Sequence, residues 1–274
     1  MKRLHYHGRL LALASVFVAI RFSGWASAAL PSLSADEIMQ KAVERAESPA
    51  SHEARPNYLY LKHTVLEDLD NKGRIKDRKE KLFEVSVEAG LSYLKLVKFN
   101  GLDLTPAELK KQDAREAAER RRLVDAKPDK KGDERENFLT ADLAQRFNFT
   151  LVSQKMFNGR NTYILDFEPK VGLVSKNLAD RFVNQMAGTA WIDAEDFEIA
   201  RAEIHLKGEV TLWGGMIGTL RRCDFALERV RLADGSWFNS FSHGLFEGRK
   251  LMEPMMIRTR SESSNFHRSS AVVP

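Results

Sequence analysis

The spacing of apolar side chains changes along the chain from a helical period to a strand-like one. Ser34-Ala35-Asp36-Glu37 has the form of a capping box, and apolar residues then recur every three or four positions as far as Ala46. Ser48-Pro49 ends this pattern, so the sequence predicts one amphipathic helix over residues 35–47. A helix with a single apolar face needs a surface on which to pack.

From residue 57 onward apolar and polar residues alternate with a period of two, which is typical of strands that are exposed on one face. Three strands are predicted around residues 58–65, 83–87 and 94–96, and Asn71-Lys72-Gly73 forms the first turn between them. The alternation resumes after residue 147. Further strands are predicted near residues 149–151, 163–167, 189–193, 200–206, 223–227, 237–246 and 255–262.

A charged segment interrupts the strands. Thr105-Pro106-Ala107-Glu108 is a second capping box, with proline in the first turn, and predicts a helix of about twenty residues. Ten basic and nine acidic residues lie between Pro106 and Glu136, a balance typical of a solvated helix and a mobile loop. A short helix near residues 140–147 is expected to close this insertion.

The order of these elements predicts the fold class. About ten strands follow one another, nearly all joined by hairpins, and strand and helix do not alternate. We therefore predict an α+β fold in which a strongly curved antiparallel sheet forms an open or half β-barrel, with helices packed in or over its concave face. The expected organisation is one domain over residues 29–262 with the charged helical insertion at 105–136, followed by a flexible tail at 263–274.

Residues 1–28 have the organisation of a secretory signal peptide. Basic residues precede an apolar stretch of 11 residues from Leu10 to Ile20, and Ala26-Ser27-Ala28 offers small residues for cleavage after Ala28. The apolar stretch is shorter than the ~20 residues that a membrane-spanning helix needs. No cysteine lies just after this stretch to carry a lipid. We predict a periplasmic, monomeric protein that is not a lipoprotein.

The net charge of +5 comes almost entirely from this segment. Its four basic residues have no acidic counterpart, so the chain after residue 28 carries a net charge of only +1. A polyanion-binding protein needs a surplus of basic residues on its folded domain. We therefore expect no nucleic-acid partner.

No group of residues has the spacing of a catalytic or metal site. The histidines after the signal peptide stand far apart, and the single cysteine, Cys223, continues an alternating strand as a small apolar residue would. The sequence contains neither a nucleophile elbow nor a phosphate-binding loop. We predict no catalytic residue, no metal and no cofactor. A secreted hydrolase whose active site no sequence motif reveals is the least favoured alternative.

Apolar surface is the main chemical feature that the sequence offers. Each aromatic residue taken alone is best interpreted as part of the core. A strongly curved sheet, however, encloses more volume than one or two helices fill, which predicts a concave hydrophobic cavity. The residues expected to line that cavity are Phe83, Val85, Leu94, Leu96, Tyr163, Leu165, Phe167, Trp191, Phe225 and Trp237.

Two segments resemble the outer-membrane lipoprotein-sorting (LolA/LolB-like) superfamily. The first ends in Phe167-Glu168-Pro169-Lys170, similar to the L-x-P-K phrase of that family, and the second contains Trp191-Ile192-Asp193 before a turn and an alternating strand. The resemblance covers about residues 34–262. It implies an unclosed β-barrel with helices as a lid that binds the acyl chains of lipids or lipoproteins in the periplasm. The charged arm at 105–136 is additional to the minimal family pattern.

Two functional hypotheses follow. The first is a periplasmic binding protein or carrier for a lipidic or acylated ligand, without catalysis, that serves transport or outer-membrane biogenesis. The second is an envelope sensor that resembles the RseB-type regulators and binds an inner- or outer-membrane protein partner.

Overall fold

The computed structural model describes residues 33–48, 57–88, 91–125, 139–212, 218–251 and 253–269. All of them belong to the compact unit Leu33–Pro274. The expected signal peptide lies outside the described residues, as does the second part of the charged insertion. No helix in the described part of the chain is long and apolar enough to cross a membrane.

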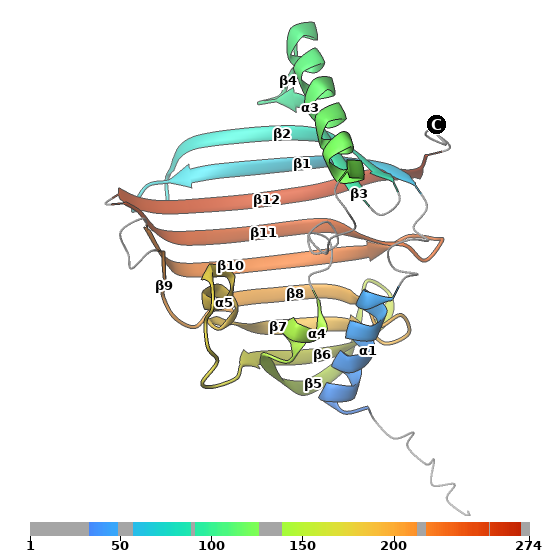
Figure 1. Ribbon diagram of the computed structural model, residues 1–274, viewed down its shortest axis with the longest axis vertical. Coiled ribbons are helices and arrows are strands. Elements are labelled where there is room, and N and C mark those ends of the chain that lie inside the picture. The colour runs from blue at the N-terminus through green and yellow to red at the C-terminus, as the bar shows by residue number, and fades with distance from the viewer. Residues whose placement is uncertain are drawn as a thin grey trace, which may run out of the picture. The chain divides into compact units, whose positions relative to one another are not determined.

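One antiparallel sheet contains the twelve strands of the described residues (Figure 1). Eleven of them follow the spatial order β4-β3-β2-β1-β12-β11-β10-β8-β7-β6-β5, and β9 pairs with β10. Over the described residues the end strands β4 and β5 do not pair with each other, so the sheet stays open. This confirms the predicted α+β half-barrel. The strands are β1 (Tyr58–Leu69), β2 (Ile75–Glu88), β3 (Leu91–Phe99), β4 (Leu102–Asp103), β5 (Phe147–Phe157), β6 (Arg160–Pro169), β7 (Met186–Asp193), β8 (Ile199–Leu206), β9 (Val210–Leu212), β10 (Gly218–Arg231), β11 (Trp237–Lys250) and β12 (Glu253–Arg268).

Helix α1 (Ala35–Glu47) begins at the predicted capping box. The Glu37 backbone N–H donates to Ser34 Oγ at 3.2 Å, and Glu37 Oε2 accepts from the Ser34 backbone N–H at 2.8 Å. Helix α3 (Pro106–Asp125) has the predicted length, and Thr105 and Glu108 make the same reciprocal pair of hydrogen bonds at its start. Two shorter helices are α4 (Ala141–Ala144) and α5 (Leu178–Val183).

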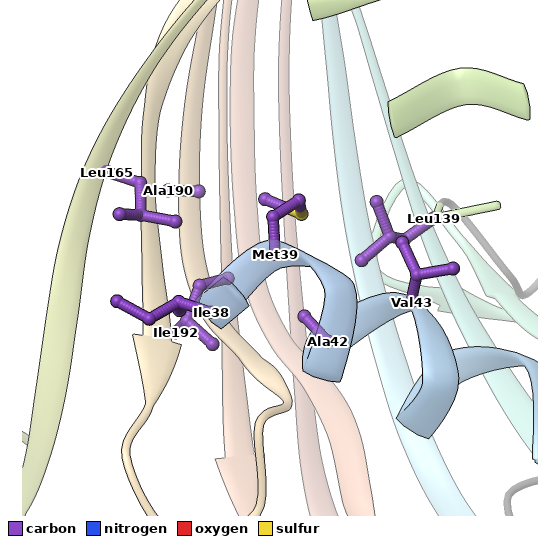
Figure 2. Packing of buried hydrophobic residues seen from close by; sticks show 8 residues of the cluster. All are labelled: Ile38, Met39, Ala42, Val43, Leu139, Leu165, Ala190 and Ile192. Carbon is purple, nitrogen blue, oxygen red and sulfur yellow. The ribbon is translucent and has the colours of Figure 1, made fainter. Parts of the chain in front are cut away.

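The apolar side of α1 packs on one face of β6 and β7, and the sheet bends around the helix (Figure 2). Ile38, Leu165 and Ile192 are completely buried there. We call this concave surface the inner face. Residues opposite one another on antiparallel strands share a face, so the inner face can be followed across the ladder through Leu165, Ala190, Ala202, Leu227, Ser242, Ser261 and Thr64.

Helix α3 packs on the other, outer face of the sheet, in contrast to α1. Ser86 and Tyr93 are opposite each other and alternate with the inner-face residues Val85 and Leu94. Arg120 of α3 donates to Ser86 Oγ at 3.0 Å, and its guanidinium lies 4.1 Å from the ring centroid of Tyr93. The expectation that the helices lie in or over the concave face therefore holds for α1 and is wrong for α3.

Strand β12 extends beyond the expected end of the folded domain at residue 262. It runs to Arg268, which is opposite Tyr58 of β1, and the Ser269 backbone N–H donates to the Asn57 carbonyl at 2.9 Å. The part of the expected tail up to Arg268 is therefore paired strand. Asn265 has a φ of 58° within an irregularity of the β1–β12 register, and this bulge interrupts the alternation that identifies a strand.

Candidate functional site

A band of apolar side chains crosses the inner face next to the area that α1 covers. It consists of Ile204, Phe225, Phe246, Ile257 and Leu66, which we call the inner band. Phe225 is opposite Ile204, and Phe246 is opposite Ile257. Four of these side chains are partly buried, and Leu66 is exposed at 38%. The inner band is therefore accessible apolar surface on five adjacent strands, in contrast to the closed core under α1.

Gly244 leaves space for the two phenyl rings of the inner band, those of Phe225 and Phe246. It is opposite Phe225 and precedes Phe246 by two residues, so all three positions share the inner face. A Cβ atom at Gly244 would lie 2.8 Å from Phe246 Cε2 and 3.2 Å from Phe225 Cδ2. The absence of a side chain here lets both rings lie over the strand.

A row of hydroxyl groups borders the inner band. Ser242, Ser261 and Thr64 are opposite one another on β11, β12 and β1. This row is next to the row of Gly244, Thr259 and Leu66, which lie two residues further along the same three strands. Thr64 Oγ1 and Ser261 Oγ are 3.0 Å apart and share a hydrogen bond. All three side chains are partly buried. The inner face thus offers adjacent apolar and hydrogen-bonding surface, which suits a ligand with a hydrocarbon part and a polar part.

Three of the predicted lining residues lie under α1. Tyr163, Leu165 and Phe167 are on the inner face of β6, where they pack with the buried side of the helix. Leu165 is completely buried. Here the helix fills the concave space, so these three residues belong to the core. Of the predicted lining residues, only Phe225 lies in the accessible inner band.

Four further predicted residues form a second group on the inner face. Phe83 is opposite Leu96, and Val85 is opposite Leu94, on strands β2 and β3. Val85 is completely buried, whereas Leu94 is 46% exposed. This group lies near the β4 end of the sheet. Strands β1, β12 and β11 separate it from Phe225, and β10 and β8 also lie between it and the core under α1.

Trp191 does not belong to a concave cavity. It is opposite Ile164 and Arg201, and it therefore lies on the outer face, with its ring centroid 5.3 Å from the Arg201 guanidinium. The expectation fails because Ala190 and Ile192 occupy the inner face of β7, and alternation directs Trp191 the other way.

Trp237 is also occupied by a structural contact. It is 7% exposed, and its indole N–H donates to Asp196 Oδ2 at 2.9 Å. This hydrogen bond ties the start of β11 to the turn between β7 and β8. Trp237 is thus a buried anchor between two chain segments.

Sequence reasoning omitted four residues of the inner band from the expected lining, namely Ile204, Phe246, Ile257 and Leu66. The strands that carry them were predicted from their alternation. The missing information was the register between strands, because it decides which of the two alternating sets joins Phe225 on the inner face.

The outer face carries charged pairs where the inner face carries the band. Arg258 and Glu67 are opposite each other and adjacent in sequence to Ile257 and Leu66, and their ion pair measures 2.6 Å. His63 Nε2 lies 2.7 Å from Glu80 Oε1 on the same outer face. Polar pairs of this exposure contribute little to stability. On these strands the accessible apolar band thus lies on the inner face, which also carries the Lys79–Asp77 ion pair beside Leu66.

The shifted pKa values of Asp193 and Cys223 have structural causes. Burial raises the pKa of the Asp193 carboxyl, but hydrogen bonds from Arg160 and from the backbone N–H groups of Asp196 and Glu195 outweigh burial and lower it. Burial raises the pKa of the Cys223 thiol. Within the described segments, no group of three or more His, Cys, Asp or Glu side chains could hold a metal ion.

A cavity of about 550 Å³ lies at a different place in the fold. It is formed by the connection after β6, helix α5 and the segment that leads into β9, and Lys170, Arg181 and Lys207 contribute to its lining. Glu209 also lines the cavity, so these three cations leave its lining with a net positive charge. Its chemistry is therefore unlike that of the inner band.

Comparisons with known proteins concern the fold. No model of a known protein family matches the chain, and no curated protein matches its sequence. Solved structures that are similar include an outer membrane lipoprotein-sorting protein domain from Vibrio parahaemolyticus, with 12% identity and a TM-score of 0.39 over 87% of this chain and 95% of that one. A LolA superfamily protein from Nitrosomonas europaea has 10% identity and a TM-score of 0.32, over 88% and 96% of the two chains.

A third similar structure is a chain of the MucA/MucB complex of Pseudomonas aeruginosa. It has 10% identity and a TM-score of 0.26, and the match covers 86% of this chain and 99% of that chain.

Proposed function

We propose that the protein is a periplasmic binding protein that takes up a lipidic or acylated ligand on the inner face of its sheet and performs no chemistry on it. The observation that carries this proposal is the inner band, a set of accessible apolar side chains on five adjacent strands that is bordered by hydroxyl groups. Monomeric soluble proteins seldom leave such a surface open without a use for it.

Burial of hydrocarbon supplies the main affinity of such a site. Each methylene group of an acyl chain that leaves water contributes roughly 0.8 kcal/mol. The phenyl rings of Phe225 and Phe246 offer a broad surface for that chain, and Ser242, Ser261 and Thr64 lie where a polar group of the ligand can form hydrogen bonds. A site of this kind accepts chains of different lengths because dispersion contacts are not directional.

Displacement of a fluorescent fatty acid by lipid extracts tests the proposal. We expect the chain from Ala29 onward to bind the probe, and we expect Phe225→Ser with Phe246→Ser to weaken binding by about tenfold or more. Phe241→Ser is the matched control, because Phe241 lies on the outer face of the same strand, where it packs against Arg260. Equal affinity of the double variant and of the control for the probe would refute binding at the inner band.

A second candidate is a sensor that binds a membrane protein, and one feature of the sheet favours it. Strand β5 is the last strand at its end of the sheet, so one side of its backbone has no strand partner among the described residues. Its side chains Val152 and Met156 are 55% and 64% exposed. An extended segment of a partner can add to such an edge. Recovery of one membrane protein with the wild type, and its loss with Met156→Lys, would support this role.

A further inference from the structure

The connection between β6 and α5 presents apolar side chains directly to solvent. Val171 is fully exposed, Val174 is 74% exposed, and Leu178, the first residue of α5, is 43% exposed. The three lie within eight residues of one another. We call residues 170–178 the apical loop; it connects the end of β6 to α5 in Figure 1.

Hydrogen bonds fix the base of the apical loop. The Lys170 backbone N–H donates to the Arg146 carbonyl at 2.8 Å, and the Lys176 backbone N–H donates to Asp180 Oδ2 at 2.8 Å. Asn184 Nδ2 donates to Ser175 Oγ at 3.0 Å. These hydrogen bonds hold both ends of the loop against neighbouring segments, which lowers the entropy cost of ordering the loop when its valine side chains bind.

The charges around the apical loop are predominantly positive. Lys170, Lys176 and Arg181 have no ion-pair partner among the described residues. The acidic groups in the neighbourhood are already paired with other cations: Glu168 with Lys207, Asp180 with Arg146 and Glu209 with Arg221. Lys170, Arg181 and Lys207 also line the cavity of about 550 Å³ at the base of the loop.

We propose that the apical loop docks on the surface of a membrane that contains anionic phospholipid. Val171, Val174 and Leu178 enter the boundary between headgroups and acyl chains, and Lys170, Lys176 and Arg181 contact the headgroup phosphates. A small apolar surface and a few positive charges each give weak membrane binding, whereas together they give stable but reversible attachment. The surrounding cations favour an anionic membrane over a protein with an apolar patch.

This docking goes beyond the proposed ligand binding and does not depend on it. The apical loop and the inner band consist of different residues on different segments. Phe225→Ser with Phe246→Ser should therefore bind vesicles like the wild type, even if it no longer binds the fatty-acid probe. Absence of probe binding by the wild type alone would therefore count against ligand binding at the inner band, and absence of vesicle binding alone would count against docking of the apical loop.

Co-sedimentation of the chain from Ala29 onward with phosphatidylglycerol–phosphatidylethanolamine vesicles tests the proposal. We expect Val171→Ser with Val174→Ser to weaken binding by about tenfold or more, and Lys170→Gln with Lys176→Gln to weaken it by about thirtyfold. Binding should decrease further when sodium chloride is raised to about 0.5 M. Phosphatidylcholine vesicles should bind the wild type more weakly.

Two matched controls separate the loop from general properties of the surface. Leu102→Ser with Leu251→Ser removes aliphatic side chains that are 74% and 58% exposed elsewhere, and Lys110→Gln with Lys111→Gln removes two positive charges from α3. Both controls should bind like the wild type. The proposal is overturned if the wild type does not bind anionic vesicles, if the loop variants bind as well as the controls, or if phosphatidylcholine vesicles bind equally well.

Discussion

Arg160, the first residue of β6, and Asp193, the last residue of β7, form a bidentate ion pair. Arg160 Nε lies 2.6 Å from Asp193 Oδ2, and Arg160 Nη2 lies 2.8 Å from Asp193 Oδ1. Asp193 is completely buried, and its Oδ1 also accepts the backbone N–H groups of Glu195 and Asp196. The aspartate of the Trp-Ile-Asp phrase thus shapes the turn between β7 and β8.

Removal of Arg160 should destabilise the fold strongly. Arg160→Ala leaves the buried carboxylate of Asp193 without its cation, which costs about 3–5 kcal/mol of unfolding free energy. Arg258→Ala removes a partly exposed ion pair with Glu67 and should cost no more than about 1 kcal/mol. Urea unfolding of both variants measures the difference. Equal losses in the two variants would contradict the structural role of the Arg160–Asp193 pair.

Acid should destabilise the protein through Asp193 and Asp234. Burial raises the pKa of the Asp234 carboxyl, but hydrogen bonds from Tyr58, Arg268 and Ser236 outweigh it and lower the pKa well below its ordinary value. A carboxyl whose pKa is lowered in the folded state contributes stability above its unfolded pKa, near 4, and loses that contribution as the pH decreases further. Thermal unfolding between pH 7 and pH 2 should show the loss, and Asp234→Asn should reduce its slope.

The contact of α1 with the sheet should depend on Ile38. This side chain is completely buried against the inner face, so Ile38→Ala should lower the unfolding free energy by about 2–5 kcal/mol. Gln40→Ala on the exposed side of the same helix is the control and should change stability by less than about 0.5 kcal/mol. Calorimetry of the two variants would contradict the described core if Ile38→Ala unfolded at the wild-type temperature.

Cys223 offers an internal probe of the inner face. It is opposite Phe246, it is 8% exposed, and burial raises the pKa of its thiol. Both effects slow the attack of a thiolate on a disulfide reagent. We expect slow reaction of the native protein with such a reagent, fast reaction after unfolding, and still slower reaction when a fatty acid is bound. Unchanged reactivity at saturating fatty acid would place the ligand away from Phe246.

Local signals in the sequence predicted the elements well, because each depends on neighbouring residues. Ser34 with Glu37 and Thr105 with Glu108 identified the starts of α1 and α3, and both capping boxes are present. The alternation of apolar residues identified the long strands. It did not identify α5, β4 or β9, which contain only 6, 2 and 3 residues and therefore carry too little periodicity.

The composition of the site was less predictable because it depends on contacts between distant strands. Trp191 and Phe225 both alternate correctly within their own strands, yet the ladder places them on opposite faces. Register shifts, such as the one between Trp191 and Ile192, change which residue faces a neighbour, and no local pattern announces them. The apical loop was missed for another reason, since exposure of Val171 is a property of the folded chain.

Native mass spectrometry of the protein, purified from the envelope of its own cells without detergent extraction, tests the central claim most directly. We predict a co-purifying mass of a lipid or an acylated molecule on the wild type and on Phe241→Ser, and its loss from Phe225→Ser with Phe246→Ser. A wild-type protein that carries no lipidic mass, and that takes up none from added lipid extract, would contradict ligand binding on the inner face.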